Sequence, residues 1–183
     1  MGTYTYAIMG FNNFALTNQG NYGGSHTTAG ITLGAVDCIM KDNINLADSN
    51  GGGWGGSRIR VIGMLVLKLG MPDTLAQVKV PYVDYDNQST ILYSDDYMFL
   101  PAEKEVFGAR SYSPTTEANA LTQFAYYKNG GNKIKSLSGT AFHWWLRSVN
   151  YNSPERFCCV NTTGYAYDYY ASQSCGVAPC FCV

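Results

Sequence analysis

The last part of the chain, residues 142–183, alternates apolar residues with tyrosine, cysteine and small polar residues. Its final twenty residues read GYAYDYYASQSCGVAPCFCV, and Asp168 is the one charged residue among them. Short alternating runs interrupted by Gly, Asn, Ser and Pro predict short strands joined by turns. We therefore expect strand and turn from residue 140 onward, with the apolar residues forming a core.

Upstream of this segment, apolar periodicity predicts a strand near the start of the chain and helices in its middle. We expect strands at 3–11 and 86–101, a loop or hairpin at 12–30, a strand or short helix at 31–40, and helices at 57–69, 72–80, 102–108 and 118–128. A strand, then helices, then a β-rich end is the order of an α+β fold. The sequence shows no internal repeat and no linker, so residues 1–183 are expected to form one domain with a core of normal size.

The composition bears on the kinds of partner. Charged residues make up only 14% of the chain and the net charge is −1, which does not indicate a nucleic-acid-binding surface. No apolar run approaches about 18 residues, so membrane insertion is not expected. The chain opens directly in strand-like sequence, TYTYAIMGF, without a basic and apolar leader. This opening suggests the C-terminal domain of a longer polypeptide.

The sequence offers little support for catalysis, and no catalytic residue or cofactor is predicted. The two histidines, His26 and His143, are not accompanied by a G-x-S-x-G nucleophile motif. The pairs Asp95/Asp96 and Glu103/Glu105 are interpreted as a turn and a solvated face rather than as catalytic carboxylates. The glycine-rich stretch 48–58 is expected to be a flexible loop, and it lacks the G-K-[ST] ending of a phosphate loop.

The cysteines are interpreted as buried free thiols. They number six, and five of them fall in the last 26 residues. Cys158 and Cys159 are neighbours, so a strand would direct them to opposite faces. The sequence contains no C-x-x-C pair and too few ligands at workable spacing for zinc, so no metal site is predicted.

Several motifs of the C-terminal part resemble a known group of domains. They are W-W-L-R-S at 144–148, F-C-x-V at 157–160, Gly164, and Y-A-S-x-S-x-G-V-A-P-x-F-C-V at 170–183. Together they resemble the C-terminal region of bacterial and phage domains with the C-type lectin fold, some of which are variable proteins of diversity-generating retroelements. The upstream segments GGGWGGSRIR, MFLPAEKEVFG and FAYYKNGGNKIKSLSGTA are also similar to this group, so the resemblance covers most of the chain.

The resemblance implies a C-type-lectin-like fold with paired N- and C-terminal strands. It also implies a ligand-binding module displayed on a phage tail or a bacterial cell surface. In such elements a reverse transcriptase copies a template repeat with errors at adenines. An Asn codon AAY can then become Tyr, Ser, Asp, Thr, Cys or His, whereas the codons of the apolar residues can be written without adenine.

Residues 142–183 are accordingly the candidate variable region. Most of the predicted ligand-binding residues are reachable from an AAY codon, and Arg156 and Gln173 are reachable from AAR. The predicted residues are Asn150, Tyr151, Asn152, Arg156, Cys159, Asn161, Thr162, Thr163, Tyr165, Tyr167, Asp168, Tyr169, Gln173 and Cys175. We expect them to form a contiguous solvent-facing patch, with an irregular turn around Asp168. Trp144 or Trp145, together with Phe157, is expected in the core.

The expected partner is a protein or a glycan on a cell surface. Tyrosine offers a large and rigid contact area, and its ring also stacks on sugars. The calcium-binding triplets E-P-N and W-N-D are absent from the sequence, so calcium-dependent sugar binding is not expected. Three alternatives stay open: ordinary exposed strands and turns with the same residue types, a structural or homo-oligomerising virion domain, and an enzyme of the formylglycine-generating type, which needs a pair of reactive cysteines.

Overall fold

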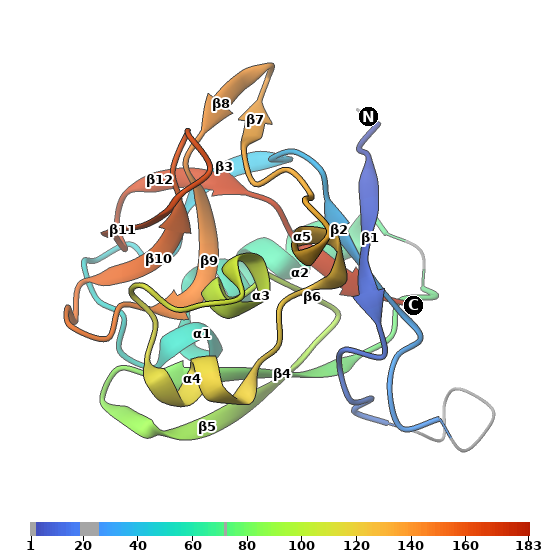
Figure 1. Ribbon diagram of the computed structural model, residues 1–183, viewed down its shortest axis with the longest axis horizontal. Helices are drawn as coiled ribbons and strands as arrows, with labels where there is room; N and C mark the ends of the chain where they lie inside the picture. The colour runs from blue at the N-terminus through green and yellow to red at the C-terminus, as the bar shows by residue number, and fades with distance from the viewer. Residues whose placement is uncertain (1–2, 19–25, 72) are drawn as a thin grey trace.

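The computed structural model describes residues 3–18, 26–71 and 73–183, and within them the chain has a mixed α+β fold (Figure 1). The strands are β1 (Tyr6–Phe11), β2 (Ile31–Ala35), β3 (Met40–Asn43), β4 (Val78–Asp84), β5 (Asn87–Asp96), β6 (Met98–Phe99), β7 (Lys135–Leu137), β8 (Thr140–Phe142), β9 (Trp144–Val149), β10 (Arg156–Val160), β11 (Ala166–Tyr170), β12 (Ser174–Val177) and β13 (Cys180–Cys182). The helices are α1 (Gly53–Gly56), the π-helix η2 (Ile59–Met64), α2 (Leu65–Leu69), α3 (Glu103–Phe107), α4 (Thr115–Ala120) and α5 (Ala125–Lys128). None of the helices in the described ranges is long and apolar enough to cross a membrane.

The strands of the described residues form two larger sheets and two hairpins. One sheet has the order β1-β2-β13-β6 and the other the order β11-β10-β9-β12-β3, while β4 pairs with β5 and β7 with β8. In Figure 1 the five-stranded sheet lies at the left and β1 and β2 at the right. The chain runs directly from β12 into β13, so the C-terminal segment links the two sheets.

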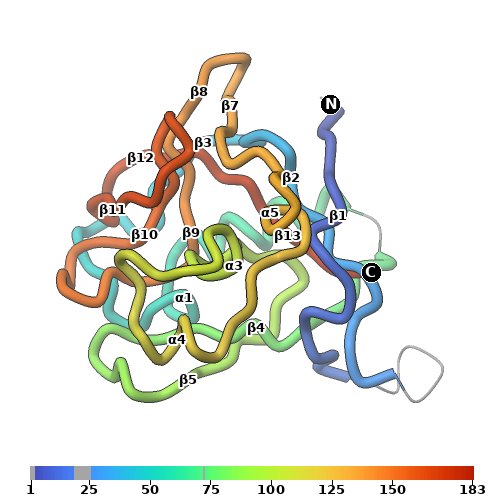
Figure 2. Tube along the Cα trace, viewed as in Figure 1, coloured from blue at the N-terminus to red at the C-terminus, as the bar shows by residue number. Residues whose placement is uncertain are grey.

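The two ends of the chain lie in one sheet, but the predicted pairing of the terminal strands is wrong. β2 lies between β1 and β13 and pairs antiparallel with both (Figure 2). The rings of Tyr6 and Phe181 meet edge to face, 5.0 Å apart, so the terminal strands are still close neighbours. β2 is therefore hydrogen-bonded along both of its edges, whereas β1 is the edge strand of this sheet.

The helices differ from the predicted ones in two places. Residues 59–69 are helical as expected, although the segment begins as a π-helix. The helix predicted at 72–80 is wrong, because β4 begins at Val78 and pairs with β5; residue 72 lies outside the described residues. The helix predicted at 118–128 is split into α4 and α5, because the backbone of Phe124 donates to the Glu105 carbonyl over 2.9 Å instead of to its own helix.

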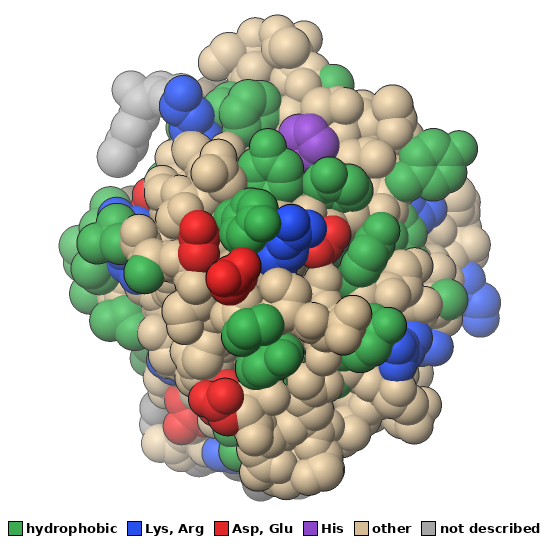
Figure 3. Space-filling model, turned by 90° about the vertical axis from the view of Figure 1, so that its left-hand side faces the viewer, with side chains coloured by type: hydrophobic (Ala, Val, Ile, Leu, Met, Phe, Trp, Pro, Cys, Tyr) green, Lys and Arg blue, Asp and Glu red, His purple; other side chains and the backbone are tan. Residues whose placement is uncertain are grey.

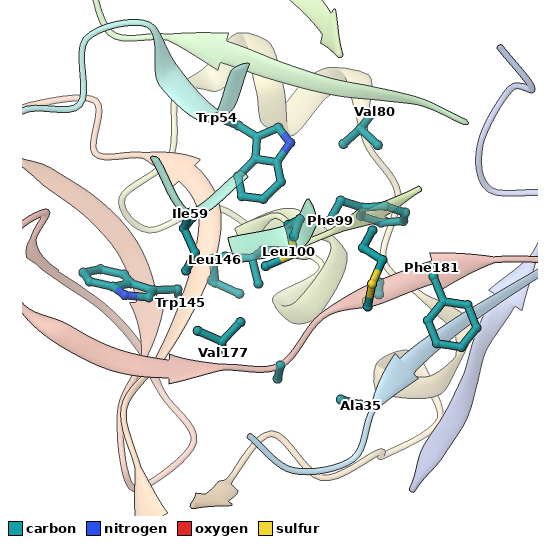
Figure 4. Packing of buried hydrophobic residues seen from close by; sticks show 14 of the residues in the cluster. Ala35, Trp54, Ile59, Val80, Phe99, Leu100, Trp145, Leu146, Val177 and Phe181 are labelled. Atoms are coloured by element: carbon teal, nitrogen blue, oxygen red, sulfur yellow. The ribbon is translucent and has the colours of Figure 1, made fainter. Parts of the chain in front are cut away.

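The core lies between the sheets and the helices, and Figure 4 shows how its side chains interdigitate. Trp144, Trp145 and Phe157 are all fully buried, which confirms their predicted place in the core. Trp54 is buried as well and donates its indole N–H to Asp96 over 2.9 Å. The stretch around Trp54 is therefore packed into the core and includes the turn of α1, contrary to the expectation of a flexible loop.

Three of the four carboxylates in the two acidic pairs are buried, and only Asp95, on β5, is exposed. Glu103, Glu105 and Asp96 are buried, which corrects the expectation of a solvated face. Glu105 forms a two-point ion pair with Arg147 of the W-W-L-R-S motif, with distances of 2.6 and 2.7 Å. Buried carboxylates are stable when paired in this way, and a sequence pattern does not show the pairing.

Candidate ligand-binding face

β10 and β11 form one side of the molecule, with β11 at the edge of the five-stranded sheet. Figure 3 looks onto this side, where hydrophobic side chains gather between basic and acidic ones. The antiparallel register places Tyr167 opposite Cys159 and Asp168 opposite Cys158. Because side chains alternate along a strand, β11 directs Tyr167 and Tyr169 to one face of the sheet and Asp168 and Tyr170 to the other.

The first face carries an aromatic cluster, defined here as His143, Tyr167 and Tyr169. The imidazole of His143 is stacked on the Tyr169 ring, with 5.6 Å between the centroids and 19° between the planes. The Tyr167 ring lies 5.9 Å from His143 and 6.0 Å from Tyr169. The cluster is partly open to solvent, so its rings offer a semi-rigid apolar surface.

Tyr165 follows the turn between β10 and β11, where its carbonyl accepts from the Asn161 N–H over 2.9 Å, and it is 71% exposed. The turn is shaped by Asn161, whose side-chain oxygen accepts from the backbone N–H groups of Thr163 and Tyr165 over 3.0 and 2.9 Å. Gly164 supplies the left-handed backbone, with φ of 83°, that the turn requires. Asn161 therefore acts through the turn it holds, and Thr163 and Tyr165 are the residues presented to solvent.

The second face carries three hydrogen-bonded polar side chains, those of Asp168, Asn150 and Arg156. Asp168 accepts from the Asn150 amide over 2.8 Å and from the Arg156 guanidinium over 3.1 Å. The guanidinium lies 4.2 Å from the centroid of the Tyr170 ring. Hydrogen bonding with Tyr170, and then with Asp168, raises the pKa of Arg156, so this group stays charged.

These residues border a depression of about 410 Å³, which we call the β11 depression. Its lining residues are Ser111, Tyr112, Asn150, Tyr151, Asn152, Ser153, Glu155, Arg156, Asp168 and Tyr170. A second depression of about 280 Å³ lies along β11 and includes Gln173 together with residues of both faces, Tyr167 and Tyr170 among them. The second depression joins the two faces, so the predicted patch runs across the edge strand rather than over a single face.

The loop that forms one wall of the β11 depression is held by a buried carboxylate. Glu103 accepts from the backbone N–H groups of Ser111, Tyr112 and Ser113, at 2.8 to 3.1 Å. Burial raises the pKa of Tyr112, and the Asp168 charge adds to the shift. The sequence interpretation misses five lining residues: Ser111, Tyr112, Ser153, Glu155 and Tyr170. A single Tyr or Ser outside the variable region gives no signal, and Tyr170 begins the closing motif.

Four of the predicted binding residues are buried, which corrects the expected exposure. Cys159 and Cys175 lie in the core, whereas Asn150 and Asp168 are buried but hydrogen-bonded to each other. The segment around Asp168 is also a regular strand and not the expected irregular turn. The partners of Asp168 compensate for its burial, so no bulge is needed to bring it to the surface.

The other predicted residues are exposed or half-buried. Exposed are Tyr151, Asn152, Thr163, Tyr165, Tyr167 and Gln173, and half-buried are Arg156, Asn161, Thr162 and Tyr169. Exposure makes these side chains available for contact with a ligand.

All six cysteines are among the described residues, where each is buried and none forms a disulfide, as predicted. Burial raises the pKa of Cys38 and of Cys175 to about 12. Burial also raises the pKa of Cys158 and Cys159 well above the ordinary range. A thiol is a nucleophile only as thiolate, so these groups are poorly reactive in the folded protein. The described residues contain no group of three or more His, Cys, Asp or Glu side chains that could hold a metal ion.

Comparison with known proteins places the chain in one family. A family model described as a domain of unknown function, DUF6273, matches residues 70–183, which is more than half of the chain. The chain therefore belongs to the DUF6273 family. The matched part includes β9, β10 and β11 and with them the whole candidate face. No curated protein and no solved structure matches the chain.

Proposed function

We propose that the chain is a ligand-binding module with a C-type-lectin-like fold, displayed on a phage tail or a bacterial cell surface, and that it recognises a protein or glycan through the face formed by β10 and β11. One observation carries this proposal. Tyr151, Tyr167 and Tyr170 all keep more than a third of their surface in solvent around two adjoining depressions, and Tyr165, just before β11, is 71% exposed. Exposed tyrosines held by neighbouring side chains are typical of recognition surfaces.

Diversification by a retroelement is part of the proposal, and burial limits which positions it would use. A position that must accept Tyr, Asp or Ser at random cannot be buried, since an unpaired buried polar group costs about 1–3 kcal/mol. Tyr151, Asn152, Thr163, Tyr165 and Tyr167 meet this condition, whereas the core thiols Cys159 and Cys175 do not. A template repeat near the gene that differs from codons 147–183 only at adenines would support diversification, and a repeat that also differs at other bases would contradict it.

The binding experiment compares the wild type with the variant in which Tyr165, Tyr167 and Tyr169 are all changed to Ser. Both proteins are screened on an array of oligosaccharides and against a displayed peptide library. Tyr93→Ser is the matched control, because Tyr93 is an exposed tyrosine on β5, outside the candidate face. We expect a ligand that the wild type and the control retain and the triple variant loses at an unchanged melting temperature. A wild type that retains no ligand, or a triple variant that binds as the wild type does, would overturn the proposal.

Self-association of a structural virion domain is the second candidate role, and one feature favours it. The helical segment 59–69 exposes an apolar stripe made of Val61, Ile62, Leu65, Val66 and Leu69, each with more than half of its surface in solvent. Contiguous apolar surface of this kind is typical of protein interfaces. Sedimentation of the wild type and of Leu65→Asp distinguishes the roles, because a dimer that Leu65→Asp dissociates would support self-association and a concentrated monomer would contradict it.

The burial of the thiols argues against an enzyme of the formylglycine-generating type. Such an enzyme needs reactive cysteines in a cleft. The thiols of this chain are buried, and the pKa of each is raised.

A further inference from the structure

We infer that the β11 depression is a subsite for an uncharged sugar ring that carries adjacent hydroxyl groups. This inference rests on the proposed function, since it names the ligand class for one part of the same face. Three features of the depression support it: the carboxylate of Asp168, the two tyrosine rings of Tyr151 and Tyr170, and the balance of charge.

The carboxylate of Asp168 has an unused acceptor. Its Oδ2 accepts from Asn150 and Arg156, whereas no donor among the described residues bonds to Oδ1. The side chain is 11% exposed, and Oδ1 is not among the buried atoms of the described residues that lack a partner, so this oxygen faces solvent in the depression. A ligand hydroxyl can take the place of water at this oxygen and donate a hydrogen bond to it. The fixed position of Asp168, held from two sides, also orients that bond.

The tyrosines beside Asp168 suit the apolar face of a sugar ring. Tyr151 is 42% and Tyr170 37% exposed, and both line the depression. Each ring has a guanidinium over it, that of Arg110 at 4.8 Å for Tyr151 and that of Arg156 at 4.2 Å for Tyr170. These stacks hold the rings in place before binding, which reduces the entropy lost when a ligand is bound.

The charges around the depression favour a neutral ligand over an anionic one. The guanidinium of Arg156 is paired with Asp168, so its positive charge is already compensated. Glu155 lines the depression and forms no ion pair with any described residue. The Arg110 guanidinium over the Tyr151 ring balances the charge of Glu155, so the charges around the depression sum to zero and offer an anionic sugar no net attraction. The volume of about 410 Å³ is within the range of small-ligand pockets.

The test measures binding of the intact chain to three sets of probes: neutral oligosaccharides, oligosaccharides that carry carboxylates, and a displayed peptide library. We expect neutral oligosaccharides to bind. For the best of them, Tyr151→Ala and Asp168→Asn should each raise the Kd about tenfold or more, since each removes a contact worth that factor. Tyr93→Ala on β5 is the control and should leave the Kd within about twofold.

Each outcome bears on the inference. Binding of carboxylate-bearing sugars alone, or of peptides alone, would overturn the sugar subsite and leave the proposed function standing. Neutral-sugar binding that is lost in the Tyr165, Tyr167, Tyr169 variant but unchanged in Tyr151→Ala would place the sugar elsewhere and overturn the inference. If Asp168→Asn does not fold, Tyr151→Ala decides, because its side chain is exposed and its loss leaves the core intact.

Discussion

Arg147 on β9 and Glu105 on α3 form an ion pair that is almost fully removed from solvent. The guanidinium donates to both carboxylate oxygens, and it also donates to the carbonyl groups of Pro81 and Leu100 over 2.9 Å. The change Glu105→Ala leaves the guanidinium charged and buried without its paired carboxylate, because Arg does not lose its proton in proteins. It also removes the acceptor of the Ala102 backbone N–H, at 2.8 Å.

Removing one partner of a buried ion pair costs about 3–5 kcal/mol. We therefore expect Glu105→Ala to lower the free energy of unfolding by at least about 3 kcal/mol, measured by urea denaturation at pH 7 and followed by tryptophan fluorescence. The control is Asp95→Ala at the Lys79–Asp95 pair, which is nearly half exposed and should contribute no more than about 1 kcal/mol. The double change Glu105→Leu and Arg147→Met should recover most of the loss, because no charge is then left buried. A loss no greater than that of the control would refute the reasoning.

Three further predictions concern the core, the buried acid of α4 and the thiols. Changing Trp144 and Phe157 to Ala should cost about 3–5 kcal/mol at each site, because both rings are fully buried, and an unchanged melting temperature would show that they are not core. Burial raises the pKa of Glu117 from its ordinary value of 4.5 to about 7, so the folded protein holds a proton that the unfolded chain releases between these pH values. The contribution of Glu117 to stability is therefore greatest below pH 4.5 and falls as the pH rises toward 7 and above. Glu117→Gln should reduce this loss of stability between pH 5 and pH 8, as measured by urea titration. An equal loss in both proteins would contradict the assignment. Cys38, with its pKa raised to about 12, and the other five buried thiols should react with a disulfide reagent at pH 8 far more slowly in the folded protein than in urea, and rapid reaction of the folded protein would show that they are accessible.

Much of the secondary structure could be predicted from local patterns. The spacing of apolar residues in 59–69 predicted a helix, and the alternation after residue 140 predicted strands, and both are present. The prediction was wrong where contacts from distant residues replace local ones. Phe124 bonds to Glu105 and interrupts the helix predicted there, and Val78 pairs with Asp96 in the strand that replaces another predicted helix.

The candidate site, too, could be predicted only in part from the sequence. Residue type and spacing were enough to select exposed side chains such as Tyr151, Tyr165 and Tyr167, because a strand or turn near the surface needs residues of this kind. They also determined that the tail has an apolar core, since Trp144, Trp145 and Phe157 have no other way to leave water.

Only the tertiary structure decided which polar residues are buried. Asp168, Glu103 and Glu105 look like surface residues in the sequence, yet each is buried beside donors that lie 10 to 42 residues away along the chain. The β11 depression depends on the same pairing, because its wall formed by the 111–113 loop is held by Glu103 and its base by Asn150 and Arg156. The free energy of a buried charge depends on what lies within hydrogen-bonding distance of it, and those neighbours are set by the folding of the whole chain rather than by the residues next to it in sequence.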